Sequence, residues 1–165
     1  MNKEIKNVKI GLFLVILTLF FGITLGGYFG IAEDVIKSYI SEGIASNPDV
    51  HDSKSSSKIW RYAQRSHFHA TGIAAFSIGL VILLMFSSIK TNLKPLVSIL
   101  IGLGGLYPLS WFTMFVLAPS IGRDAAHQHL ITEILAYTGI GGLLLGLTIL
   151  SANLFFNCFT ETPSN

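Results

Sequence analysis

Four long stretches without charged residues constrain the fold of this chain more than any other feature of the sequence. Crossing the hydrocarbon core of a bilayer takes about 20 apolar residues in a helix. Only 12% of the 165 residues are charged, whereas soluble domains carry about 25%. The stretches are residues 11–31, 68–89, 95–121 and 130–160, with Glu133 as the one charge inside them.

We therefore predict an all-α integral membrane four-helix bundle that forms one domain over residues 1–165. The first apolar stretch is longer than the core of a signal peptide and has no small-x-small site behind it, so we expect it to remain as an anchor. The predicted transmembrane helices lie near 9–30, 67–89, 95–118 and 128–157.

The distribution of Lys and Arg predicts the orientation of these helices. Cytoplasmic loops are enriched in these residues, and short loops carry most of the information. The predicted inner segments hold five lysines, whereas the short loop before the fourth helix holds only Arg123. The long loop from about 31 to 66 also holds basic residues, but longer segments count less. These residues are Lys37, Lys54, Lys58, Arg61 and Arg65. We expect both termini to be cytoplasmic, in the plasma (inner) membrane. Because the positive charges follow from topology, the net charge of +2 does not indicate nucleic-acid binding.

The longer loop between the first two helices contains a helical pattern. Apolar residues recur at helical spacing over 31–44, and charged and serine residues occupy the other face. This pattern predicts an amphipathic helix lying on the membrane surface or on the ends of the bundle. Residues 47–58, which contain Pro48 and His51, are predicted to form an exposed, solvated turn.

Two His-x-His tripeptides supply four of the five histidines of the chain. The first motif is His67-Phe68-His69 and the second is His127-Gln128-His129, 60 residues later. Parallel second and fourth helices would place both motifs at one depth. We expect the second helix to begin near Ser57 and the fourth helix to begin before its motif, with Ser120 as a cap.

Helix geometry limits what each motif can bind. Side chains at i and i+2 point about 200° apart, so only one histidine of each pair faces a given partner. One possibility is haem b held by His69 and His129, which leaves His67 and His127 for a second cofactor or a neighbouring subunit. The other is zinc, copper or iron held by His69, His129 and Glu133. Glu133 follows His129 by one turn, on the same stripe.

The first motif resembles a known haem-binding helix. Ser66-His67-Phe68-His69 and the small and apolar residues through Gly79 are similar to the His-Phe-His helix of haem–copper oxidase subunit I. In that family the two histidines ligate two different haems. With the second motif, the arrangement is also similar to four-helix membrane cytochromes b, which take histidines from two helices per haem. These resemblances imply haem ligation, without proton-pumping oxidase activity.

These observations favour a small membrane subunit of a redox complex that transfers electrons through a bis-histidine haem near the outer face. Its expected partners are the lipid bilayer, other membrane redox subunits or a second copy of the chain, and quinone. A non-haem metal protein and a cofactor-free accessory subunit remain open alternatives. The sequence holds no nucleotide motif or nucleophile constellation, so an electron-transfer or accessory role is favoured over a stand-alone enzyme.

Overall fold

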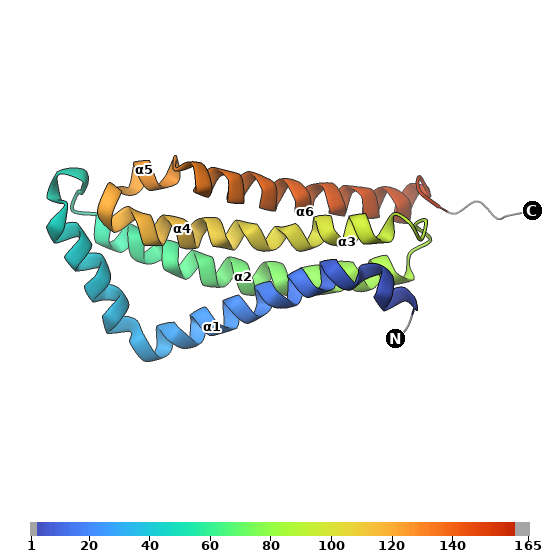
Figure 1. Cartoon of the computed structure of the whole chain (residues 1–165), viewed down its shortest axis with the longest axis horizontal. Coiled ribbons are helices and arrows are strands. Elements are labelled where there is room, and N and C mark those ends of the chain that lie inside the picture. Colours follow the sequence, from blue (N-terminus) through green and yellow to red (C-terminus); the bar gives the residue numbers. More distant parts are fainter. Residues whose placement is uncertain (1–2, 161–165) are drawn as a thin grey trace, which may run out of the picture.

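The computed structural model describes residues 3–160 and is helical almost throughout that range (Figure 1). Four helices are long and apolar enough to cross a membrane, as predicted. The third crossing is built from two helices joined by a 3-10 turn, η2 (Leu103–Gly105). The elements are α1 (Lys3–Ser46), η1 (Pro48–Val50), α2 (Ser55–Phe86), α3 (Lys94–Gly102), α4 (Leu106–Ile121), α5 (Arg123–His127) and α6 (Leu130–Phe156).

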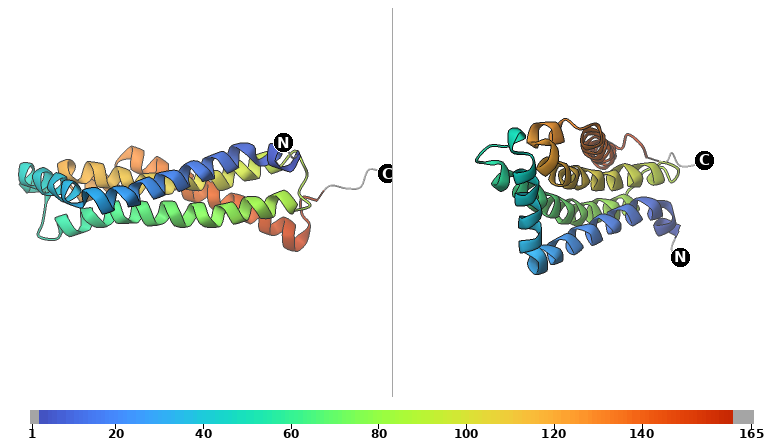
Figure 2. Two further views of the ribbon diagram at one scale, coloured as in Figure 1. Left: turned by 90° about the horizontal axis from the view of Figure 1, so that it is seen from below. Right: turned by 60° about the vertical axis from the view of Figure 1, so that its left-hand side comes forward.

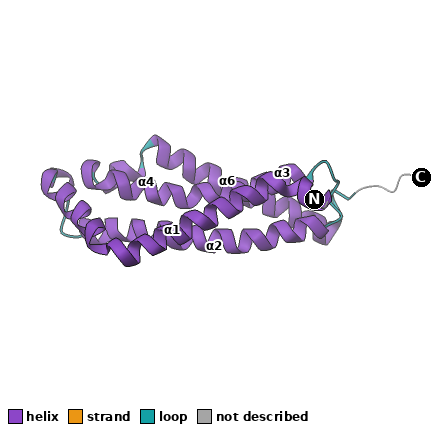
Figure 3. Ribbon diagram, turned by 60° about the horizontal axis from the view of Figure 1, so that its bottom comes forward, coloured by secondary structure: helices purple, strands orange, loops and turns teal. Residues whose placement is uncertain are grey.

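Successive long helices run in opposite directions along the bundle, and short loops connect them at its two ends (Figures 1 and 3). The chain enters at the start of α1 and leaves beyond α6 at one end, which we call the terminal end. The opposite end carries the loop 47–54 and α5, and we call it the histidine end. Because α2 and α6 both start there, both His-x-His motifs lie at this end.

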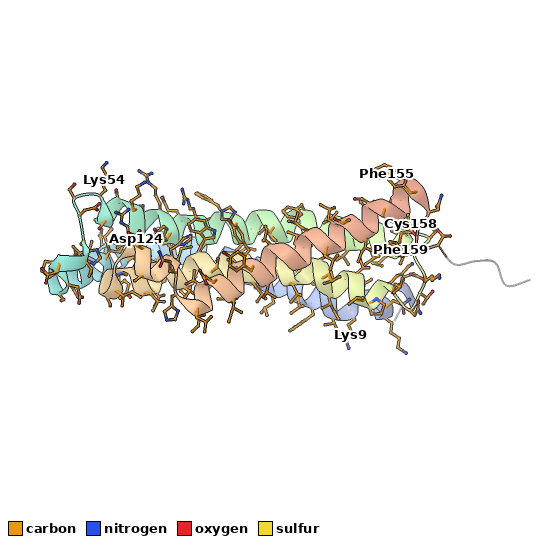
Figure 4. All side chains as sticks on the ribbon, turned by 90° about the horizontal axis from the view of Figure 1, so that it is seen from above. Lys9, Lys54, Asp124, Phe155, Cys158 and Phe159 are labelled. Carbon is orange, nitrogen blue, oxygen red and sulfur yellow. The ribbon has the colours of Figure 1, made fainter. Side chains whose placement is uncertain are left out.

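The α3–α4 span is the centre of the bundle. It packs against α1 and α2 on one side and against α6 on the other, whereas α2 and α6 make hardly any direct contact. Close approach of α6 depends on glycine, because a side chain at Gly139 would collide with the α4 backbone at Tyr107. Side chains at Gly142 and Gly146 would be tightly crowded by η2 and α3. In the view onto α6, this helix crosses the bundle obliquely (Figure 4).

Helix α1 is longer than predicted and bends sharply. Its dihedral angles become non-helical at Ala32, and the second arm runs across the histidine end (Figure 2). Ile36 and Ile40 of this arm are buried in a cluster with residues of α2 and α4. Residues 31–44 are thus helical apart from the kink at Ala32, beyond which they form the second arm of α1. Their placement on a membrane surface stays a prediction.

Ion pairs fasten both ends of the bundle. At the terminal end, the buried Lys94 ammonium donates to Glu4 Oε2 and to the Met85 carbonyl oxygen, both at 2.8 Å. At the histidine end, Arg123 Nη2 donates to Asp52 Oδ2 at 2.8 Å. A hydrogen bond from the Ser55 hydroxyl is the main reason that the pKa of Asp52 is lowered.

The loop 47–54 at the histidine end contacts the bundle through His51, although its polar composition predicts a solvated loop. His51 is half-buried, and its Nε2 lies 3.0 Å from the carbonyl oxygen of Pro119, which closes the end of α4. The expectation of a solvated histidine was wrong, because this carbonyl cannot be recognised from local sequence.

Candidate functional site

The two histidines of the first motif face different helices, as their i, i+2 spacing requires. His67 Nδ1 lies 2.8 Å from the carbonyl oxygen of Gly22 on α1. Its ring fits over Gly26, where a side chain would collide with the imidazole, and its edge meets Phe29. Gly22 and Gly26, the Gly-x-x-x-Gly pair of α1, therefore form the surface against which His67 packs, and we call this surface the seat of His67. Sequence reasoning gives such pairs only a general packing role.

His69 instead packs against two aromatic residues of α4. Its ring is stacked on Trp111, with centroids 5.9 Å apart and planes at 25°, and it meets Tyr107 edge-on at 5.1 Å. The guanidinium of Arg65, one turn earlier on α2, lies 4.7 Å from the Trp111 ring centroid. Tyr107 and Trp111 thus form an aromatic wall, with His69 and Arg65 on its α2 side.

The second motif lies at a break between two helices. His127 ends α5, and His129 is the N-cap of α6, where its Nδ1 accepts a hydrogen bond from the Ile131 N–H at 3.3 Å. The expectation of a continuous helix through this motif was wrong. The chain turns at Gly122, whose φ of 83° suits only glycine, and again before α6.

A pocket of about 180 Å³ opens between α4 and α6 at this level. The aromatic wall forms one side, and His127 and Glu133 contribute an imidazole and a carboxylate. The indole Nε1 of Trp111 is buried and has no hydrogen-bond partner among the described residues. The pocket lining includes Tyr107, Trp111, Met114, His127, Glu133 and Tyr137.

This pocket can hold one small aromatic ring. An engineered apolar cavity of about 150 Å³ takes up benzene, so 180 Å³ suits a six-membered ring with small substituents. The wall residues offer π-faces, while the carboxylate of Glu133 and the imidazole of His127 accept hydrogen bonds from hydroxyl groups.

A haem shared by α2 and α6 does not fit this single chain as folded. The α3–α4 span lies between the two helices, and the aromatic wall stands between His69 and the pocket. A pocket of about 180 Å³ is also too small for a porphyrin. His129 accepts a hydrogen bond at Nδ1, so in a neutral ring the proton is on Nε2. Nε2 is then a donor and has no lone pair with which to ligate the haem iron.

The structure brings Glu133 together with His127, whereas His69 lies across the wall and His67 faces α1. Within residues 3–160, no group of three or more His, Cys, Asp or Glu side chains is close enough to hold a metal ion. Metal binding by His69, His129 and Glu133 stays a prediction.

The aromatic wall was the part of the site that sequence reasoning missed. Tyr107 and Trp111 read as packing residues around Pro108, since aromatic residues are common in membrane helices. One signal was available in retrospect. Arg65 and His69 are one turn apart on α2, so both can cover one aromatic ring on a neighbouring helix.

The architecture is a bundle of four helices long and apolar enough to cross a membrane, with a small, mostly apolar pocket toward one end. Comparisons with protein-family models, with curated proteins and with solved structures gave no match to this chain.

Proposed function

We propose that this chain is a small membrane subunit that binds the headgroup of a quinone or quinol in the α4–α6 pocket and serves electron transfer in a larger redox complex. The observation that carries the proposal is the convergence of an aromatic wall, a carboxylate and an imidazole on one ring-sized pocket. The pocket lies between helices that are long enough to cross a membrane. A quinone with an isoprenoid tail is dissolved in the membrane, so it can reach such a pocket.

The chemistry of a quinol headgroup matches these side chains. The ring carries two oxygen atoms on opposite sides, and each needs a hydrogen-bond partner. Glu133 and His127 accept from quinol hydroxyls, and the N–H of a neutral His127 ring can instead donate to a quinone oxygen. The faces of Tyr107 and Trp111 stack on the ring. The chain's part in this proposal is binding and orientation, and the oxidant or reductant belongs to partner subunits.

Tryptophan fluorescence offers a direct test, because the chain has only Trp60 and Trp111. In the Trp60→Phe protein, Trp111 is the sole reporter and lines the pocket. We expect saturable quenching on titration with a short-chain ubiquinone in detergent micelles. The Trp111→Phe protein retains Trp60, which packs near Phe29 of α1, and should show only the linear quenching of non-specific partitioning.

Variants of the carboxylate sharpen the test. In the Trp60→Phe background titrated with the reduced short-chain ubiquinol, Glu133→Gln should weaken the apparent affinity about tenfold, because a hydrogen bond to a charged group is lost. Glu42→Gln removes an exposed carboxylate of α1 and serves as the matched control. Linear quenching in both single-tryptophan proteins, or equal affinity in both glutamine variants, would refute the proposal.

The same preparation decides between quinone binding and the haem hypothesis. A dithionite-reduced minus oxidised spectrum with sharp α and Soret bands would show a bis-histidine haem and would require another arrangement of the motifs, such as one shared between two copies. Stoichiometric zinc, copper or iron in a sample without these bands would favour the non-haem alternative.

We further propose that both termini are cytoplasmic, which puts the pocket near the outer face. The lysines at the terminal end support this orientation, with Lys6, Lys9 and Lys90 in or beside short segments. Reporter fusions after Lys90 and after Asp124 test it. A cytoplasmic signal after Asp124 would place the pocket near the inner face instead.

A further inference from the structure

Four basic residues form a stripe on the first turns of α2. Lys54, Lys58, Arg61 and Arg65 are separated by four, three and four residues. At 100° per residue these positions fall within a sector of about 60° and extend for about 16 Å along the helix axis. Lys54, Arg61 and Arg65 are exposed and Lys58 is partly exposed. Figure 4 shows Lys54 at the end of the bundle opposite Lys9.

Nothing else in the described chain neutralises most of this stripe. The three ion pairs among residues 3–160 involve other cations, namely Lys37, Lys94 and Arg123. The carboxylate of Asp52 lies beside Lys54, but it accepts a hydrogen bond from Arg123.

The stripe is also unfavourable for the helix that carries it. Like charges at i and i+4 repel one another, and Lys54–Lys58 and Arg61–Arg65 are two such pairs. The N-terminus of a helix is the positive end of its dipole, and the first turn of α2 contains no acidic residue to offset it. A bound anion would relieve both effects, so the stripe has the properties of an anion site.

The position of Arg61 and Arg65 relative to the bilayer identifies the anion. Arg65 is the last charged residue before an uncharged run of α2 that continues to its end at Phe86. Arg61 lies about 6 Å further out. The headgroup layer on each side of a bilayer is about 5–7 Å thick. Both guanidinium groups therefore reach the depth of lipid phosphates, and the neighbouring Trp60 and Tyr62 are typical of this layer.

We propose that the stripe of Lys54, Lys58, Arg61 and Arg65 binds the phosphate headgroup of an anionic phospholipid. Arg61 and Arg65 hold the phosphate, since guanidinium groups bind phosphate oxygens in a bidentate manner. Lys58 and Lys54 lie further out and attract the charge over a longer range. Arg65 also contacts Trp111, which lines the α4–α6 pocket, but the proposed lipid site does not depend on quinone binding.

Lipid-dependent thermal stability tests this site. The full-length protein is delipidated in a neutral detergent, and its Tm is followed during titration with dioleoylphosphatidylglycerol or dioleoylphosphatidylcholine. We expect saturable stabilisation by phosphatidylglycerol alone. A basic residue near an anionic lipid surface contributes about fivefold in affinity, so Arg61→Gln/Arg65→Gln should weaken the apparent affinity about 25-fold.

Two further variants keep the result interpretable. Arg61→Lys/Arg65→Lys preserves the charge and should retain most of the phosphatidylglycerol effect, even if the glutamine variant folds poorly. Lys6→Gln/Lys9→Gln removes two exposed cations from the terminal end and should leave the apparent affinity unchanged. Equal stabilisation by the two lipids, or equal losses in the two glutamine variants, would overturn the proposal.

Soluble anions distinguish other sources of negative charge. Stabilisation by inorganic phosphate at the same concentration would show a site for a free anion and would contradict the lipid assignment. Stabilisation by polyglutamate without an effect of phosphatidylglycerol would show that an acidic protein segment is the partner.

Discussion

The two His-x-His motifs have the same spacing and lie at the same end of the bundle, yet their surroundings differ. The first motif is part of the continuous helix α2, which directs His67 toward α1 and His69 toward α4. The second motif spans a helix break, where His127 lines the pocket and His129 caps α6. The comparison teaches that i, i+2 spacing has a fixed geometric meaning only where the backbone stays helical.

This difference also separates structural from binding roles. His67 and His129 both form hydrogen bonds with backbone groups, and each serves the packing or the end of a helix. His69 and His127 lie on either side of the aromatic wall of Tyr107 and Trp111. One histidine from each motif thus lies beside the aromatic wall of the pocket. In the first motif it is the third residue, His69, and in the second motif it is the first residue, His127.

The largest effect is expected at the seat of His67. Gly26→Leu should cost about 2 kcal/mol of stability, because the new side chain occupies the space of the imidazole and forces α1 away from α2. Gly27→Leu is the matched control, since a side chain there has open space. Unfolding by denaturant titration in mixed micelles measures both variants. Equal destabilisation would mean that His67 is not seated on α1.

A smaller effect is expected for the helix cap at His129. His129→Ala should cost about 1 kcal/mol, because the N–H groups of the first turn of α6 lose their side-chain acceptor. His129→Asn should restore most of this stability, and neither change should alter quinone affinity. Loss of quinone affinity in both variants, with unchanged stability, would move His129 from the cap into the binding site.

The smallest effect concerns the clamp that holds the start of α5. The lowered pKa of Asp52 means that its carboxylate stabilises the fold at pH values above the ordinary carboxyl range, and that this contribution disappears as the pH falls through the lowered value. Asp52→Asn should therefore lower the Tm slightly at pH 7, and the difference should disappear as the pH falls through the lowered pKa of Asp52. Asp49→Asn, a change at a neighbouring exposed position, is the control. A constant difference at all pH values would indicate packing rather than charge.

Much of the fold could be predicted from the sequence, because uncharged runs of sufficient length leave few alternatives to membrane-spanning helices. The parallel course of α2 and α6 followed from counting crossings. The kink at Ala32 and the break after His127 could not be predicted, since both depend on how the ends of the bundle pack.

The candidate site was predicted only in part. Glu133 was singled out because a carboxylate inside a predicted membrane span is costly and therefore tends to be functional. Its partner in the pocket is His127 rather than His129, and this exchange depends on the helix break. The contacts of Trp111 with His69 and Arg65 link residues more than 40 positions apart, so no local pattern in the sequence could reveal them.

The most direct test of the account is to map where a quinone binds. The full-length protein in lipid nanodiscs is illuminated with an azido-quinone, digested and analysed by mass spectrometry, with unlabelled quinone as competitor. We predict competable labelling of segments 107–114 and 127–137. Competable labelling confined to α1, or labelling that unlabelled quinone does not displace, would contradict the assignment of the pocket.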